Sequence, residues 1–187
     1  MSQPLEGAVE LLERSLAYTR GTLAGVRPEL LDGPTPCVGW TLGQLMAHME
    51  DALDAFTEAA GGAVKVDVVG TAFGRVAAIQ DKACRLLGVW TRPAPGDVVI
   101  TGSDGDLDLG SPLLVATAAL EVTVHGWDVS QATGTRHPIP DDLARELLPL
   151  AHAVVGPADR LVRFAPPQAT AADAPYDVRL LAFLGRG

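Results

Sequence analysis

Apolar residues recur at helical spacing along most of this 187-residue chain, and this periodicity constrains the fold more than any other feature. Leu42, Leu45, Met49 and Leu53, for example, follow one another three or four positions apart. Such spacing gives a helix one apolar face, which must pack against another element. The pattern predicts long helices at residues 5–23, 41–60, 71–87, 111–133 and 140–155, and a short one at 178–184.

Capping residues support three of these boundaries. Thr41 with Gln44 three positions later is the pattern of a capping box. Ser111 as N-cap, followed by Pro112 in the first helical position, opens the fourth helix, and Gly134 stands where a helix C-terminal glycine belongs. These signals make the fourth helix the longest of the chain.

One short β-hairpin is expected before the fourth helix. Residues 97–101 and 107–109 alternate between apolar and polar types, and the glycine-containing turn 102–105 lies between them. An isolated hairpin is only marginally stable, so it must lean on the helices. The fold class is therefore mainly all-α, a helical bundle with a small hairpin, in a single domain that spans 1–187.

Composition and charge exclude several classes of function. With 14 basic and 23 acidic residues the net charge is -9, and no cluster of basic residues is present, so neither nucleic acid nor an anionic membrane is an expected partner. No apolar run is long enough to span a membrane, and the N-terminus has no signal-peptide pattern. We therefore expect a cytoplasmic location.

Two cysteines are too few for a disulfide framework. Cys84 lies in a helical pattern, which predicts a core thiol, whereas Cys37 lies between breaker residues and is expected to be the exposed thiol of a loop. Neither cysteine has neighbours in sequence that suggest a zinc knuckle.

Polar residues with metal-ligand chemistry stand on two of the predicted helices. Glu121, His125 and Asp128 are spaced i, i+4, i+7 and share one face of an otherwise apolar helix, and His48 lies in the apolar run of the second helix. Two histidines and one glutamate form a zinc-type ligand set with an open fourth position. The alternative is an ordinary Glu121–His125 ion pair with His48 as a core histidine.

Three segments resemble a known family. TPCVGWTLGQLMAH at 35–48, EVTVHGWD at 121–128 followed by ATG at 132–134, and RLLAFLGR at 179–186 resemble the signatures of the actinobacterial maleylpyruvate isomerase N-terminal, DinB-like metal-binding family. The resemblance implies a DinB-like four-helix bundle. It also implies a divalent metal, zinc or another such as Ni²⁺, held by His48, Glu121 and His125.

The resemblance further implies a metal-dependent thiol S-transferase or isomerase, in which mycothiol is the thiol cosubstrate and a small electrophilic metabolite is the substrate. Trp40 and Gln44 are expected to border the pocket, and Asp128 is expected to orient a ligand from outside the metal's own ligand shell. The isomerase has a separate C-terminal domain for which the residues after 155 leave no room, so the transferase is favoured over isomerisation of maleylpyruvate. The alternative functions are a non-catalytic protein that sequesters a small molecule in the bundle cavity and a metal-free bundle that binds another protein.

Overall fold

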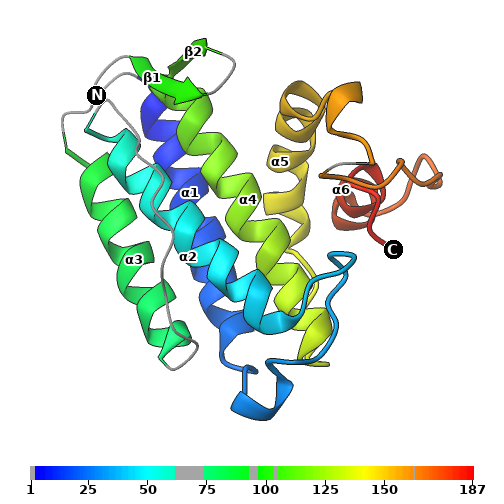
Figure 1. The fold of residues 1–187 in the computed structure, drawn as a ribbon. Coiled ribbons are helices and arrows are strands. Elements are labelled where there is room, and N and C mark those ends of the chain that lie inside the picture. The colour runs from blue at the N-terminus through cyan, green and yellow to red at the C-terminus, as the bar shows by residue number, and fades with distance from the viewer. Residues whose placement is uncertain (1–2, 62–73, 93–96, 103–104, 162) are drawn as a thin grey trace.

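The computed structural model describes residues 3–61, 74–92, 97–102, 105–161 and 163–187. Four long helices form the bundle, and two further helices lie beside it, with α6 and the C-terminus on the far side of α5 (Figure 1). In chain order the helices are α1 (Gln3–Leu23), α2 (Leu42–Ala59), α3 (Arg75–Trp90), α4 (Ser111–Ala132), α5 (Asp141–Val154) and α6 (Tyr176–Phe183). The mainly helical fold predicted from the sequence is thus confirmed.

Helix α4 runs through the middle of the molecule and packs most closely against α1. Their backbones approach because Gly126 has no side chain: a Cβ there would lie 2.5 Å from Thr19 Oγ1. The Thr19 hydroxyl donates a 2.8 Å hydrogen bond to the carbonyl of Val122, which fixes the position of α4 along α1. Residues on several sides of α4 are therefore buried, and its polar residues lie inside the bundle.

Helix boundaries follow the predicted caps with one difference. The capping box of Thr41 and Gln44 is present at the start of α2, and Gly134 follows α4 with a positive φ of 75°. The N-cap of α4, however, is Gly110, so the prediction of Ser111 as the cap was wrong. Ser111 is already helical, because proline is tolerated anywhere in the first turn, where a missing N–H breaks no helical hydrogen bond.

Helix α3 begins at Arg75, after Gly74 as its N-cap, and extends further than predicted at its C-terminal end. The predicted start, residues 71–73, lies outside the described residues. The helix continues past Leu87 to Trp90, which is fully buried and donates a 3.0 Å hydrogen bond to the Phe56 carbonyl of α2. Its buried stripe is Ile79, Leu86 and Trp90. The prediction of Cys84 as a core residue was wrong: it lies off this stripe and is exposed.

Two short strands precede α4, namely β1 (Asp97–Gly102) and β2 (Gly105–Gly110), and they pair antiparallel with Val98 opposite Leu109. Val98 is fully buried, so this pair is anchored to the helical core. The turn positions 103 and 104 lie outside the described residues. In the part of the chain that the structure describes, no helix has the length and apolar character needed to cross a membrane.

Candidate metal centre

Three predicted ligands meet between α2 and α4. Glu121 Oε1 lies 2.7 Å from His48 Nε2 and 3.0 Å from His125 Nε2. The ligand atoms of these three side chains all lie within 4.8 Å of one another. His125 follows Glu121 by one helical turn, and the packing of α2 against α4 brings in His48. Residues 73 positions apart in sequence are thereby joined at one carboxylate oxygen.

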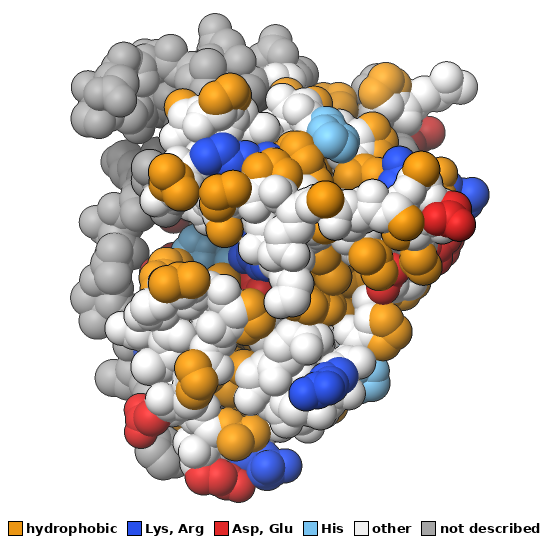
Figure 2. Space-filling view, turned by 90° about the vertical axis from the view of Figure 1, so that its right-hand side faces the viewer, with side chains coloured by type: hydrophobic (Ala, Val, Ile, Leu, Met, Phe, Trp, Pro, Cys, Tyr) orange, Lys and Arg blue, Asp and Glu red, His pale blue; other side chains and the backbone are white. Residues whose placement is uncertain are grey.

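The cluster is reached from one side. His48 keeps 37% of its side chain exposed, whereas Glu121 and His125 keep 24% and 11%. The Trp40 ring meets His48 edge-on, with ring centroids 5.0 Å apart, so this aromatic side chain lies beside the cluster. Figure 2 shows a recess on the left of one face in which a histidine is visible among hydrophobic, acidic and basic side chains.

Mutual charge stabilisation dominates the electrostatics of the cluster. Burial opposes ionisation of Glu121, but His125 and His48 outweigh it and hold the pKa of this carboxyl well below its usual range. Burial also opposes protonation of His125, yet Glu121 and the hydrogen bond to Asp128 raise its pKa well above the ordinary value. Without a metal the site is therefore a carboxylate with a neighbouring imidazolium, and a divalent cation would replace the proton's charge.

Asp128 holds His125 from behind. Its Oδ2 lies 3.0 Å from His125 Nδ1, which leaves Nε2 directed at Glu121 and the open side of the site. Asp128 is fully buried, and two guanidinium nitrogens of Arg186 bind its carboxylate. Nε donates to Oδ1 at 2.8 Å and Nη2 donates to Oδ2 at 2.9 Å. Burial opposes ionisation of Asp128, but His125 and Arg186 lower its pKa.

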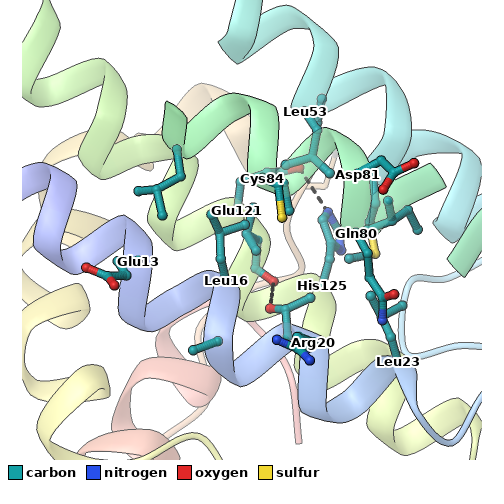
Figure 3. A pocket seen from close by; sticks show the side chains of 18 residues that line it. Glu13, Leu16, Arg20, Leu23, Leu53, Gln80, Asp81, Cys84, Glu121 and His125 are labelled. Carbon is teal, nitrogen blue, oxygen red and sulfur yellow. Dashed lines mark hydrogen bonds and ion pairs between the residues drawn. The ribbon is translucent and has the colours of Figure 1, made fainter. Parts of the chain in front are cut away.

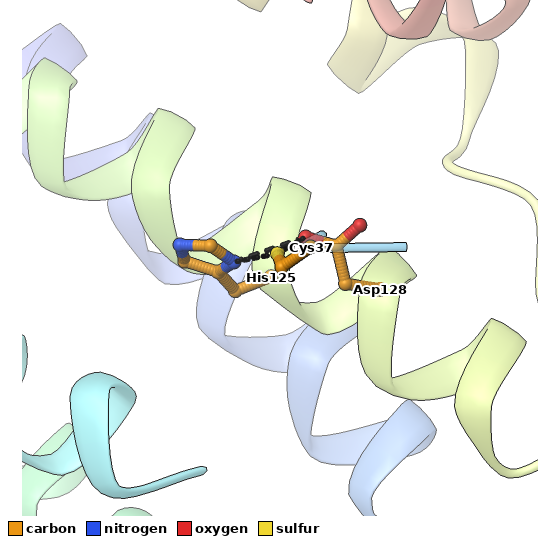
Figure 4. A group of neighbouring side chains, drawn as sticks. All are labelled: Cys37, His125 and Asp128. Carbon is orange, nitrogen blue, oxygen red and sulfur yellow. Dashed lines mark hydrogen bonds and ion pairs between the residues drawn. The ribbon is translucent and has the colours of Figure 1, made fainter. Parts of the chain in front are cut away.

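Cys37 joins this network from the loop before α2 (Figure 4). Its thiol donates to Asp128 Oδ2 at 3.1 Å and lies 3.8 Å from His125 Nδ1, so the side chain is half-buried rather than an exposed loop thiol. Cys37, His125 and Asp128 also have the spacing of a metal-ligand group. Because the Arg186 cation is bonded to both Asp128 oxygens, a metal ion there would meet a positive charge. The group around Glu121 is the better cation site.

Two predicted site residues differ in how they relate to the cluster. Asp128 has the orienting position expected for it, whereas Gln44 is exposed and its side chain accepts a 2.9 Å hydrogen bond from the Thr41 backbone N–H in the capping box. Sequence reasoning missed Arg186, because a residue near the end of the chain has no helical neighbour that connects it to Asp128. The signal available was its place at the end of the third family-like segment.

A cavity of about 490 Å³ reaches the cluster from the side of α1 and α3 (Figure 3). Glu121, Val122 and His125 of α4 form part of its lining, and α1, α2 and α3 supply the rest. Ligand pockets of this volume accept drug-sized molecules. The three-residue cluster therefore has a volume beside it in which a reactant can bind.

The fold and the cluster define a helical-bundle protein with a candidate site for a divalent metal. Residues 12–130 match the family described as the mycothiol maleylpyruvate isomerase N-terminal domain, and the chain belongs to this family. It is 31% identical, over 88% of its length, to the uncharacterized protein Rv0738 of Mycobacterium tuberculosis H37Rv, of which 89% is covered. The uncharacterized protein MT0763 of strain CDC 1551 matches to the same extent.

A solved structure supports the fold. The crystal structure of a mutant of the mycothiol-dependent maleylpyruvate isomerase superposes with a TM-score of 0.55 at 15% identity. The match covers 69% of this chain and 63% of that one, so the chain spans less than two thirds of the isomerase. This likeness shows a common helical fold.

Proposed function

We propose that this protein is a metal-dependent thiol S-transferase or isomerase that uses mycothiol and acts on a small electrophilic metabolite. The observation that carries the proposal is the convergence of His48 Nε2, Glu121 Oε1 and His125 Nε2. Family membership supports the choice of mycothiol as the thiol, because the family takes its description from the mycothiol maleylpyruvate isomerase.

The donor set fits a divalent metal. Two imidazole nitrogens and one carboxylate oxygen are typical catalytic zinc ligands, and they leave a fourth position for a reactant. Glu121 is held ionised, as a ligand must be, and the contact of Asp128 with Nδ1 of His125 is the outer-shell hydrogen bond that metal-bound histidines usually have. Zinc or nickel ions suit these ligands.

A bound divalent cation would lower the pKa of a thiol and so supply a thiolate near neutral pH. The residues of the chain position the reactants. Glu121 contributes one negative charge, so the site retains net charge +1 with the metal and attracts a thiolate. In the transfer, a C–S bond forms either as a bond to a leaving group such as chloride breaks, with the thiol proton released to solvent, or as a C=C π bond breaks, with that proton ending on the neighbouring carbon. In an isomerisation, the thiol leaves again after rotation about that bond.

Metal content of the purified protein tests the site first. Elemental mass spectrometry is expected to find about one zinc or nickel per chain in the wild type and none in His48→Ala or His125→Ala, because each loses one of three protein ligands. His137→Ala is the matched control, since His137 is exposed in the loop before α5 and should leave the metal content unchanged.

Adduct formation between mycothiol and monochlorobimane tests the chemistry. It is expected to stop on addition of a chelator and to return with zinc. Adduct formation at full rate in metal-free protein would overturn the proposal. Metal binding without turnover on any electrophile would favour the alternative of a small-molecule binding protein.

A further inference from the structure

The cavity between α1 and α3 leads to the metal cluster and has walls of uneven chemistry. Its lining contains Glu121 and His125, and the labelled side chains of α1 and α3 face each other across it (Figure 3). We call it the α1/α3 cavity. A molecule that fills it lies next to Glu121 and His125, where the thiol would be activated.

The walls of the α1/α3 cavity are mostly apolar. Leu16 and Leu23 of α1, Leu53 of α2, and Ile79 and Leu87 of α3 line it. Leu23, Leu53 and Ile79 are each only 2% exposed, so this part of the wall belongs to the helical core. Such walls favour an apolar body, because its burial removes hydrocarbon surface from water without leaving polar groups unpaired.

The charged residues of the cavity limit the charge of its ligand. Glu13 on α1 and Asp81 on α3 are carboxylates on opposite walls, and Arg20 is the only arginine or lysine among the described residues of the lining, where the charge of His125 is already paired with Glu121. Recognition of two carboxylates usually requires two well-placed cations. A dicarboxylate would therefore find one partner at Arg20 and repulsion from Glu13 and Asp81.

We infer that the α1/α3 cavity holds the electrophile, and that this electrophile is a largely apolar molecule with at most one negative charge. That the ligand is the electrophile rests on the proposed function, whereas the preference for an apolar ligand with at most one negative charge follows from the cavity alone. A small dicarboxylate does not fit this preference, because Arg20 is the only arginine or lysine of the lining described here and His125 is already paired with Glu121.

Fluorescence titration with N-phenyl-1-naphthylamine, a neutral apolar probe, tests the preference on the full chain with and without added zinc. One saturable site per chain is expected. Three unreactive competitors with the same phenyl group then vary the charge: neutral N-phenylsuccinimide, monoanionic N-phenylsuccinamate and dianionic phenylsuccinate. The first two should displace the probe, and phenylsuccinate should be at least tenfold weaker.

Two variants of α1 locate the binding. Ala17 is exposed and lines the cavity, so Ala17→Phe should fill it without disturbing the core and should weaken probe binding at least tenfold. Glu10 is exposed on the same face two turns earlier but does not line the cavity, so Glu10→Phe should bind the probe within twofold of the wild type.

Absence of a saturable site, an unchanged affinity in Ala17→Phe, or displacement by phenylsuccinate as strong as that by the imide would each overturn the inference. These titrations involve neither thiol nor turnover. A protein that binds the probe series as expected but holds no metal would refute the proposed function and leave the ligand preference standing. A protein that shows metal-dependent transfer but does not bind the probe and its competitors as expected would refute the ligand preference and leave the proposed function standing.

Discussion

Asp128 and Arg186 form a buried, two-point ion pair that joins the C-terminal segment to the candidate metal centre. The side chain of Asp128 is fully buried and that of Arg186 is 8% exposed, and the two hydrogen bonds measure 2.8 and 2.9 Å. Because Asp128 also contacts His125, the end of the chain helps to hold a candidate metal ligand in place.

Removal of Arg186 should destabilise the fold strongly. Arg186→Met leaves a buried carboxylate without its main partner, and breaking a buried pair in this way costs about 3–5 kcal/mol of unfolding free energy. Urea denaturation measures the loss. Arg163→Met is the matched control: Arg163 is 67% exposed and pairs with Asp159 at the surface, so its loss should cost at most about 1 kcal/mol.

Zinc affinity of Arg186→Lys adds a readout beyond stability. Lysine keeps the charge but cannot bond both oxygens of Asp128, so the orientation of His125 is loosened. We expect zinc binding to weaken by about tenfold or more in a competition titration with a chromophoric chelator. An affinity equal to that of the wild type would show that Arg186 serves the fold alone.

Gly126→Ala should destabilise the packing of α1 on α4. The added methyl carbon would lie 2.5 Å from Thr19 Oγ1 and 3.2 Å from Thr19 Cα, and such overpacking costs about 1–3 kcal/mol. Gly21→Ala makes the same change in an exposed turn of α1 with no atom within 4 Å, where alanine should stabilise the helix by about 0.5–1 kcal/mol. Thermal unfolding of the two variants should therefore shift in opposite directions.

The raised pKa of Tyr18 predicts that the folded state loses stability at alkaline pH. Burial and the charge of Asp128 raise its pKa above the ordinary value of 10.0, and its hydroxyl donates a 2.9 Å hydrogen bond to the His137 carbonyl. The folded state thus retains the proton that the unfolded state loses near pH 10, so this contribution is complete below pH 10 and declines as the pH rises beyond it. The decline is at most about 1.4 kcal/mol per pH unit.

Tyr18→Phe checks this assignment. The variant cannot lose a proton at this position, so its stability curve should fall less steeply above pH 10 than that of the wild type. Chemical denaturation at pH 9, 10 and 11 measures the difference. Parallel curves for the two proteins would contradict the prediction.

Gln44→Ala separates a capping role from a pocket role. Its side chain completes the capping box with the Thr41 N–H, so the variant should lose about 0.5–1 kcal/mol of stability, within the range measured for helix caps. Zinc content and the rate of mycothiol transfer should not change. A raised KM for the thiol at unchanged kcat would show instead that Gln44 contacts the cosubstrate.

The sequence alone determined where the helices lie and which residues of α4 belong to the candidate site. Periodicity located the helices to within a few residues, because an amphipathic stripe records which face is buried. The i, i+4 and i+3 spacings fixed Glu121, His125 and Asp128 on one face, since helix geometry makes such residues neighbours wherever the helix lies. The buried stripe of α3 was misjudged at Cys84, because which face is covered depends on the partner helix.

Tertiary structure decided everything that joins distant segments. His48 meets Glu121 only because α2 packs on α4, and Arg186 meets Asp128 only because the C-terminal segment folds back beside α5 and reaches α4. Neither contact has a local spacing rule, since long-range pairs are set by the packing of whole helices and not by neighbouring residues. The same packing created the α1/α3 cavity, whose volume and charge are properties of four helices together.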